Sequence, residues 1–226
     1  MYVMTLHRSS IGKKIIMAVT GVIGLGFVLL HMYGNLKAFM GPEYFNAYAE
    51  GLRSLGAPVF SHLHLLILTR IILIAAVGLH IWAAYSLTQQ AWHARPSNYM
   101  VKKNVQANYA SVTMRYGGVV LVIFLLYHLM HLTWGMPVVP GGFTRGDAYG
   151  NLVNGFHFLP ATILYLAGVT ALGFHLYHGI FSACQTLGLN NDSTETPIRA
   201  ASLAFALVIA VGFAAVPLAV VFGVIH

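Results

Sequence analysis

Five apolar segments, each about 20 residues or longer, dominate the sequence and limit what it can fold into. They are expected at residues 12–36, 62–88, 112–135, 158–187 and 200–225. A helix of about 20 residues crosses the roughly 30 Å of hydrocarbon in a bilayer, and backbone groups in lipid must be satisfied within their own segment. We therefore expect an all-α integral membrane protein in which residues 1–226 form one transmembrane domain, a five-helix bundle.

The composition supports the membrane class and excludes several others. Of 226 residues, 58% are hydrophobic and 8% are charged, whereas soluble domains carry roughly 25% charged residues. The net charge of +7 does not indicate a nucleic-acid partner, because the basic residues are scattered through connecting segments. Cys184 is the single cysteine, so neither an intrachain disulfide nor a cysteine-bound iron–sulfur cluster is expected.

The lysines and arginines near the segment ends predict the orientation. Cytoplasmic loops of membrane proteins are enriched in these residues. One side of the predicted bundle carries eight of them, namely Arg8, Lys13, Lys14, Arg95, Lys102, Lys103, Arg115 and Arg199. The other side carries three, namely Lys37, Arg53 and Arg145. We therefore expect the N-terminus in the cytoplasm.

Each of the first four predicted helices carries a histidine roughly two-thirds of the way along its length, an unusual place for an ionisable residue. These four residues are His31, His80, His128 and His175. Because consecutive helices run in opposite directions, His31 and His128 are expected toward the outer face. His80 and His175 are expected toward the cytoplasmic face, which gives two pairs at two depths.

A single buried histidine is usually a hydrogen-bonded core residue, but four at matched depths favour a shared role as ligands. The predicted spans contain no aspartate, glutamate or cysteine cluster for another metal site, whereas neutral imidazole is a good axial ligand of haem iron. We therefore predict two haems b between helices one to four. Gly34 and Gly179, close in sequence to the first and fourth histidines, would leave flat helix surface for the rings, although small residues are also common at membrane helix contacts.

Two of the predicted helices offer a second histidine one turn further on. His131 follows His128, and His178 follows His175, so both members of each pair face roughly the same way. The first members match the depth of their partners better and are the predicted ligands. His131 and His178 are left for propionate contacts, quinone hydrogen bonds or packing. Arg70 is expected either to meet the propionates of the outer haem or to extend its side chain to water.

Four short motifs carry a resemblance to a known family: "HMYGNLKAF", "GLHIWAAY", "YHLMHLTWG" and "FHLYHGIFSA". In this order and at these depths, they resemble the dihaem cytochrome b membrane-anchor subunit of succinate dehydrogenase or fumarate reductase. The similarity is to the single-chain, five-helix type of Gram-positive and related bacteria, and it covers nearly the whole chain.

The resemblance implies a respiratory complex II of the tricarboxylic acid cycle, in the bacterial cytoplasmic membrane. It pairs His80 with His175 for the haem proximal to the cytoplasmic subunits, and His31 with His128 for the distal haem. It implies two partners, a flavoprotein with covalent FAD that oxidises succinate and an iron–sulfur subunit. Electrons would pass through the haems to a quinone, and the subtype implies menaquinone. The chain itself would contain no catalytic residue.

Two places could bind the quinone. The N-terminal stretch "LHRSS", which resembles the quinone site of related anchors, contributes His7, Arg8, Ser9 and Ser10. The outer end contributes Tyr33, Lys37, His131 and Trp134. The spans lack the glutamate that some dihaem fumarate reductases use for proton transfer, so proton movement by such a residue is not expected.

Three alternatives stay open from the sequence. The same subunit could serve a fumarate reductase that works in the reverse direction. Anchors of formate dehydrogenase or hydrogenase also hold two haems b, but they do not place one ligand on each of helices one to four. A small transporter or structural membrane protein could use the histidines as a proton relay, although no inverted repeat with broken helices is visible.

Overall fold

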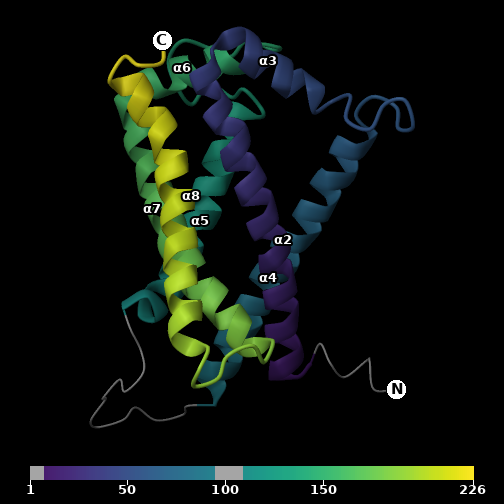
Figure 1. The fold of residues 1–226 in the computed structure, drawn as a ribbon, viewed down its shortest axis with the longest axis vertical. Helices are drawn as coiled ribbons and strands as arrows, with labels where there is room; N and C mark the ends of the chain where they lie inside the picture. The colour runs from purple at the N-terminus through teal and green to yellow at the C-terminus, as the bar shows by residue number, and fades with distance from the viewer. Residues whose placement is uncertain (1–7, 95–108) are drawn as a thin grey trace.

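The computed structural model describes residues 8–94 and 109–226, which form a bundle of five long helices (Figure 1). The helices are α2 (Ser10–Leu36), α4 (His64–His93), α5 (Tyr109–Leu132), α7 (Leu159–Thr186) and α8 (Glu195–Val221). All five contain a stretch that is long and apolar enough to cross a membrane. No strand occurs in this described part of the chain. The predicted class, an all-α integral membrane protein with a five-helix bundle, is confirmed.

Three of the long helices, α2, α5 and α8, begin before the apolar runs that predicted them. α2 begins at Ser10 because the hydroxyl of Ser9 accepts a hydrogen bond from the backbone N–H of Gly12 (2.9 Å). α8 begins five residues before the predicted start, where Glu195 and Arg199 form an ion pair one turn apart (2.8 Å). Hydropathy indicates which part of a helix lies in hydrocarbon, whereas caps and ion pairs determine where the helix begins and ends.

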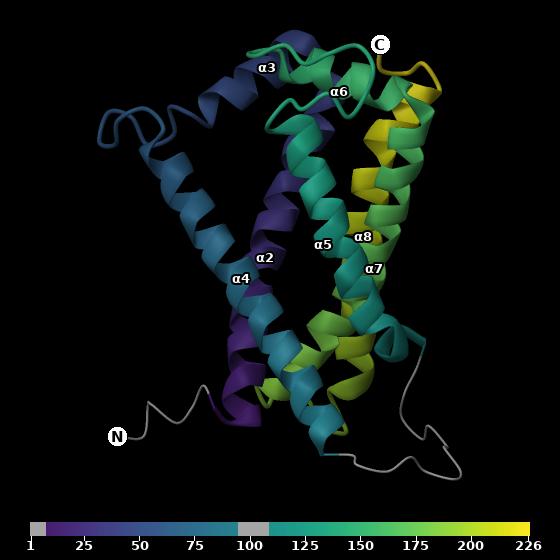
Figure 2. The same cartoon turned by 180° about the vertical axis from the view of Figure 1, so that it is seen from behind.

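Large apolar side chains point outward along the bundle, as lipid requires. Ile74 on α4 is 74% exposed, and Val119 on α5 is 60% exposed. Small residues make the contact between α2 and α4, where Ala76 and Ala83 on α4 are buried on the same face as His80. α4 leans away from α2 toward the end that carries α3 (Figure 2). At the level of His80 the two helices are in contact, because its ring meets Met17 and Thr20 of α2.

Two short helices that the hydropathy pattern did not predict lie together at the end of the bundle opposite the start of α2 (Figures 1 and 2). They are α3 (Pro42–Gly51), which follows the 3₁₀ turn η1 (Lys37–Met40), and α6 (Ala148–His157). The side chain of Asn46 joins them. It donates to Asp147 Oδ1 (3.0 Å) and accepts from the backbone N–H of Tyr149 (2.9 Å). We call α3 and α6 together the outer cap.

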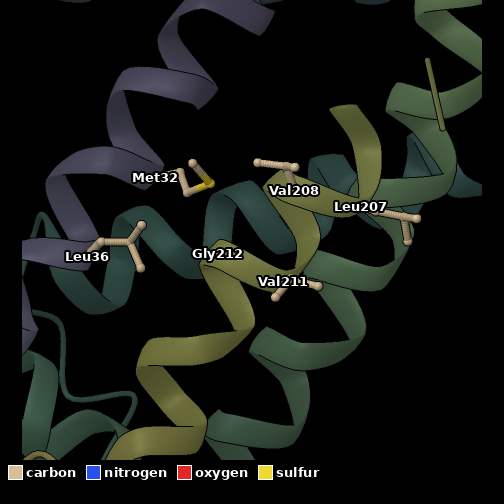
Figure 3. Close-up of a pocket in the computed structure, with 6 residues that line it drawn as sticks. All are labelled: Met32, Leu36, Leu207, Val208, Val211 and Gly212. Carbon is tan, nitrogen blue, oxygen red and sulfur yellow. The ribbon is translucent and has the colours of Figure 1, made fainter. Parts of the chain in front are cut away.

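An apolar pocket lies between α2 and α8 (Figure 3). It is lined by Met32, Leu36, Leu207, Val208, Val211 and Gly212. The absence of a side chain at Gly212 lets Met32 lie against α8. None of the lining side chains carries a hydrogen-bonding or titratable group, so the candidate site for chemistry lies elsewhere in the bundle.

The capping carboxylate of Asp147 offers a test of the outer cap. Hydrogen bonds from the Gly150 N–H and the Asn46 amide lower the pKa of Asp147 below its usual 3.8. Replacing Asp147 by Ala is expected to destabilise the protein by about 1 kcal/mol, a typical loss for an N-cap, as measured by thermal unfolding in detergent.

The contribution of the Asp147 carboxylate to stability should change with pH in one direction. A lowered folded-state pKa means that the carboxylate stabilises the fold fully above the unfolded value and loses this effect as the pH falls through the lowered value. The difference in melting temperature between wild type and D147N should therefore shrink on acidification in that range. A difference that stays constant there would contradict the role of the charge.

Candidate functional site

The four intramembrane histidines meet as two pairs, one at each of two levels of the bundle. The ring centres of His31 on α2 and His128 on α5 are 5.7 Å apart, with an angle of 82° between the planes. Those of His80 on α4 and His175 on α7 are 6.1 Å apart, at 60°. We call these the outer pair and the inner pair. They are the pairings expected from the helix directions, whereas their role as iron ligands stays a prediction.

The spacing of both pairs fits two axial ligands on one iron. Ring centres of two such imidazoles lie about 6 Å apart, because each metal–nitrogen bond is about 2 Å long and each ring centre is about 1 Å behind its nitrogen. Across residues 8–94 and 109–226, no group of three or more His, Cys, Asp or Glu side chains could hold a bare metal ion. A haem needs only two protein ligands, so the residues present fit this group.

A third helix orients His80 of the inner pair. Its Nδ1 lies 3.1 Å from the backbone carbonyl oxygen of Met17 and 3.2 Å from Thr20 Oγ1, both on α2. A carbonyl oxygen only accepts hydrogen bonds, so Nδ1 carries the proton and donates. The lone pair is then on Nε2, the arrangement that metal-binding histidines show when the other ring nitrogen is held by the backbone.

The other histidine of the inner pair has an unmatched polar atom. Nδ1 of His175 is buried and has no hydrogen-bond partner among the residues that the structure describes. His178, one turn further along α7, is only partly buried. Beyond it, the guanidinium of Arg199 on α8 stacks 3.9 Å from the ring centre of Phe181. The space beside Gly179 is open, since an added Cβ would meet nothing within 4 Å.

The outer pair is surrounded by aromatic rings. His31 stacks on Phe27 (ring centres 5.2 Å apart) and lies 5.7 Å from Phe213 on α8. His128 has a hydrogen-bond partner, because its Nδ1 lies 3.2 Å from the hydroxyl of Tyr165 on α7. The same hydroxyl lies 3.1 Å from Nδ1 of His131.

His131 differs from His128 in its surroundings. The residue is 3% exposed, and its ring lies against α6 at Gly155, where a side chain would collide with it. Its Nε2 is buried without a hydrogen-bond partner in the described part of the chain. Because this nitrogen faces backbone, whereas the ring of His128 lies beside His31, His128 is better placed as the second member of the outer pair.

An aromatic cage surrounds the ammonium of Lys37 at the outer end of α2. Its Nζ lies 4.8 Å from the ring centre of Tyr33, 5.1 Å from that of Tyr48 and 5.8 Å from that of Tyr44. Each distance is within the range of a cation–π contact. Gly34 permits this arrangement, because a Cβ there would lie 2.9 Å from the ring of Tyr48.

The other residues predicted for the haem surroundings or the quinone site do not come together at one place. Arg70 is exposed on the outward-leaning part of α4, and Trp134 is 57% exposed just after α5. Ser9 caps α2, while Ser10 begins it. The backbone carbonyl of Arg8 accepts a long hydrogen bond from Gln90 (3.5 Å). His7 lies outside the described residues.

Sequence reasoning missed the side chains that support the paired histidines. Thr20 and Tyr165 belong to helices other than those of the histidines they bond, so no spacing along the chain reveals them. Tyr44 and Tyr48 are four residues apart, which places them on one helical face. This four-residue spacing is visible in the sequence, but it indicates a shared face only if α3 is recognised as a helix.

The fold defines an integral membrane protein in which two pairs of histidines face each other between the helices. Residues 95–218 match the family described as the succinate dehydrogenase/fumarate reductase transmembrane subunit. This match spans more than half of the chain, which therefore belongs to that family. It includes His128 and His175, whereas His31 and His80 precede it. No curated protein and no solved structure matches the chain.

Gly155 provides a test of how α6 holds His131. Replacing Gly155 by Ala places a methyl group against the imidazole, and an overpacked core site costs about 1–3 kcal/mol. G51A is the matched control, because a Cβ at Gly51 meets nothing within 4 Å. We expect thermal unfolding in detergent to show the loss for G155A alone. Equal melting temperatures for the two variants would contradict this packing.

Proposed function

We propose that this transmembrane subunit holds two haems b, one between His80 and His175 and the other between His31 and His128. The observation that carries the proposal is the spacing of both pairs, 6.1 Å and 5.7 Å between ring centres, which suits two imidazoles on one iron. When bound, the haems supply one-electron transfer between the two membrane faces.

The chain's own residues prepare these positions. The Met17 carbonyl oxygen fixes the proton of His80 on Nδ1, and the close contact of α2 with α4 holds the ring in place. At the outer level, Phe27 and Phe213 shield His31 from water and lipid. These contacts limit how far each imidazole can turn, which favours binding of a metal in one geometry.

We further propose that the end carrying the N-terminus faces the cytoplasm of a bacterial cell and docks the iron–sulfur subunit, with the FAD-containing flavoprotein beyond it. Support comes from the family, whose members are subunits of succinate dehydrogenase or fumarate reductase, and from the eight-to-three excess of basic residues on that side. In this arrangement, the inner pair is nearest the source of electrons.

The quinone site is proposed at the Lys37 cage, with menaquinone as the substrate. The Lys37 ammonium and the phenol groups around it are hydrogen-bond donors that suit quinone carbonyl oxygens. Lys37 is six residues beyond His31, about 9 Å of helix rise, so a quinone there would lie close to the outer pair. The N-terminal group around Arg8 is the alternative location and would lie near the inner pair.

The direction proposed is from succinate to quinone. Fumarate reduction is the second candidate, because the family description includes both enzymes. Family membership argues against the anchors of other dehydrogenases and against a transporter. The succinate-oxidising site is assigned to the flavoprotein, and this chain contributes electron transfer and quinone binding.

Single histidine replacements test the pairing. H80A and H175A should each reduce the bound haem from two per chain to one and remove the same component of the reduced-minus-oxidised spectrum. H31A and H128A should remove the other component. Haem content is measured on the purified complex, with H62A as the control because His62 lies outside the long helices. Two haems retained in any of the four ligand variants would refute the assignment for that residue.

Replacement of Lys37 tests the quinone location. K37Q should raise the quinone KM of succinate-driven quinone reduction by about tenfold, the loss expected for one charge-assisted hydrogen bond of roughly 1.4 kcal/mol. K14Q is the control, since Lys14 lies at the opposite end of α2. A raised KM for R8Q with an unchanged value for K37Q would move the site to the cytoplasmic end.

A further inference from the structure

The hydroxyl of Tyr165 lies between two imidazoles inside the bundle. It is 3.2 Å from Nδ1 of His128 and 3.1 Å from Nδ1 of His131, and the tyrosine is 6% exposed. Edge-on rings hold its own ring in place, with Phe156 at 4.9 Å and Phe124 at 5.3 Å between centres. The hydroxyl therefore has little freedom to turn toward other partners.

The hydroxyl of Tyr165 has one proton and two lone pairs. When its proton is used within this group of three, the hydroxyl donates to one imidazole and accepts from the other, which gives two arrangements. If it donates to His128, the proton of the neutral His128 ring must be on Nε2. If it accepts from His128, that ring has its proton on Nδ1 and a lone pair on Nε2. Only the second arrangement leaves His128 able to bind a metal through Nε2.

We propose that Tyr165 is a positioning residue for the outer pair: its hydroxyl accepts a hydrogen bond from Nδ1 of His128 and donates one to Nδ1 of His131. His131 is then the acceptor that turns the hydroxyl in the right direction. The inference rests on the proposed haem site, and it gives His131 a role in which it binds neither haem nor quinone.

His131 is buried within hydrogen-bond distance of the Tyr165 hydroxyl, as this role requires. An acceptor at Nδ1 places the His131 proton on Nε2, which is buried beside Gly155 without a hydrogen-bond partner in residues 8–94 and 109–226. This nitrogen is unmatched in either tautomer, so the contact at Nδ1 carries the inference.

The test is Tyr165→Phe, which removes the hydroxyl and keeps the ring. A hydrogen bond from Nδ1–H to an acceptor makes an imidazole more basic and favours ferric iron. Its loss should raise the midpoint potential of the haem that His31 and His128 hold, by about 59 mV for each tenfold change in relative affinity for the two iron states. The haem at the inner pair should keep its potential.

Tyr127→Phe is the matched control, because Tyr127 packs in the same ring cluster, 6.0 Å from Tyr165 between centres. Redox titration followed by optical spectra separates the two haems. Two haems in the wild type establish the proposed function independently. Against that background, an unchanged outer potential in Y165F, or an equal shift in Y127F, would overturn the role of the hydroxyl.

His131 supplies a second test that does not depend on how Y165F folds. H131L removes the acceptor and should lower retention of the outer haem by about tenfold, the lower end for lost partners of a metal-binding histidine. H131Q keeps an acceptor and should restore retention, measured as haem content after dilution into haem-free detergent. Equal retention in H131L and wild type, or equal loss in H131L and H131Q, would contradict the proposal.

Discussion

The rest of this structure depends on how the histidine imidazoles are accommodated in hydrocarbon. An imidazole in the bilayer is costly unless its nitrogens meet partners, because no water is present to satisfy them. The bundle brings the rings together in two pairs and meets this condition for one ring of each pair, which has a hydrogen-bond partner on another helix. The small residues of α4, the Tyr165 ring cluster and the contact of α2 with α4 all serve that arrangement.

The two pairs share one asymmetry. In the inner pair, His80 is oriented by the Met17 backbone, while Nδ1 of His175 is buried without a partner in the described part of the chain. In the outer pair, His128 is hydrogen-bonded by Tyr165, while His31 is held by stacked rings. A backbone carbonyl can only accept, whereas a hydroxyl can do either. The tautomer of His80 is thus fixed by the fold, and that of His128 depends on a side chain.

The long helices and the histidine pairs could be predicted because both depend on simple geometry: the length of an apolar run and the alternating directions of successive spans. Depth along the helix already favoured His128 over His131, but the surroundings that distinguish the two could not be predicted: His128 lies beside His31, and His131 lies against the backbone at Gly155. α3 and α6 also escaped prediction. Both are too short to span a membrane. α6 packs buried apolar side chains such as Leu152 and Phe156 against Val216 and Val220 of α8, and Asn46 joins α3 to it.

The outer cap has a larger part in the outer site than its position in connecting segments suggests. α3 supplies Tyr44 and Tyr48 to the cage around Lys37, and α6 supplies the glycine against which His131 packs. No comparable helix covers the inner pair among the described residues, where α2, α4 and α7 make the contacts. The two ends of the bundle therefore differ in construction: short helices cover the outer pair, whereas the inner pair depends on the long helices alone for its contacts.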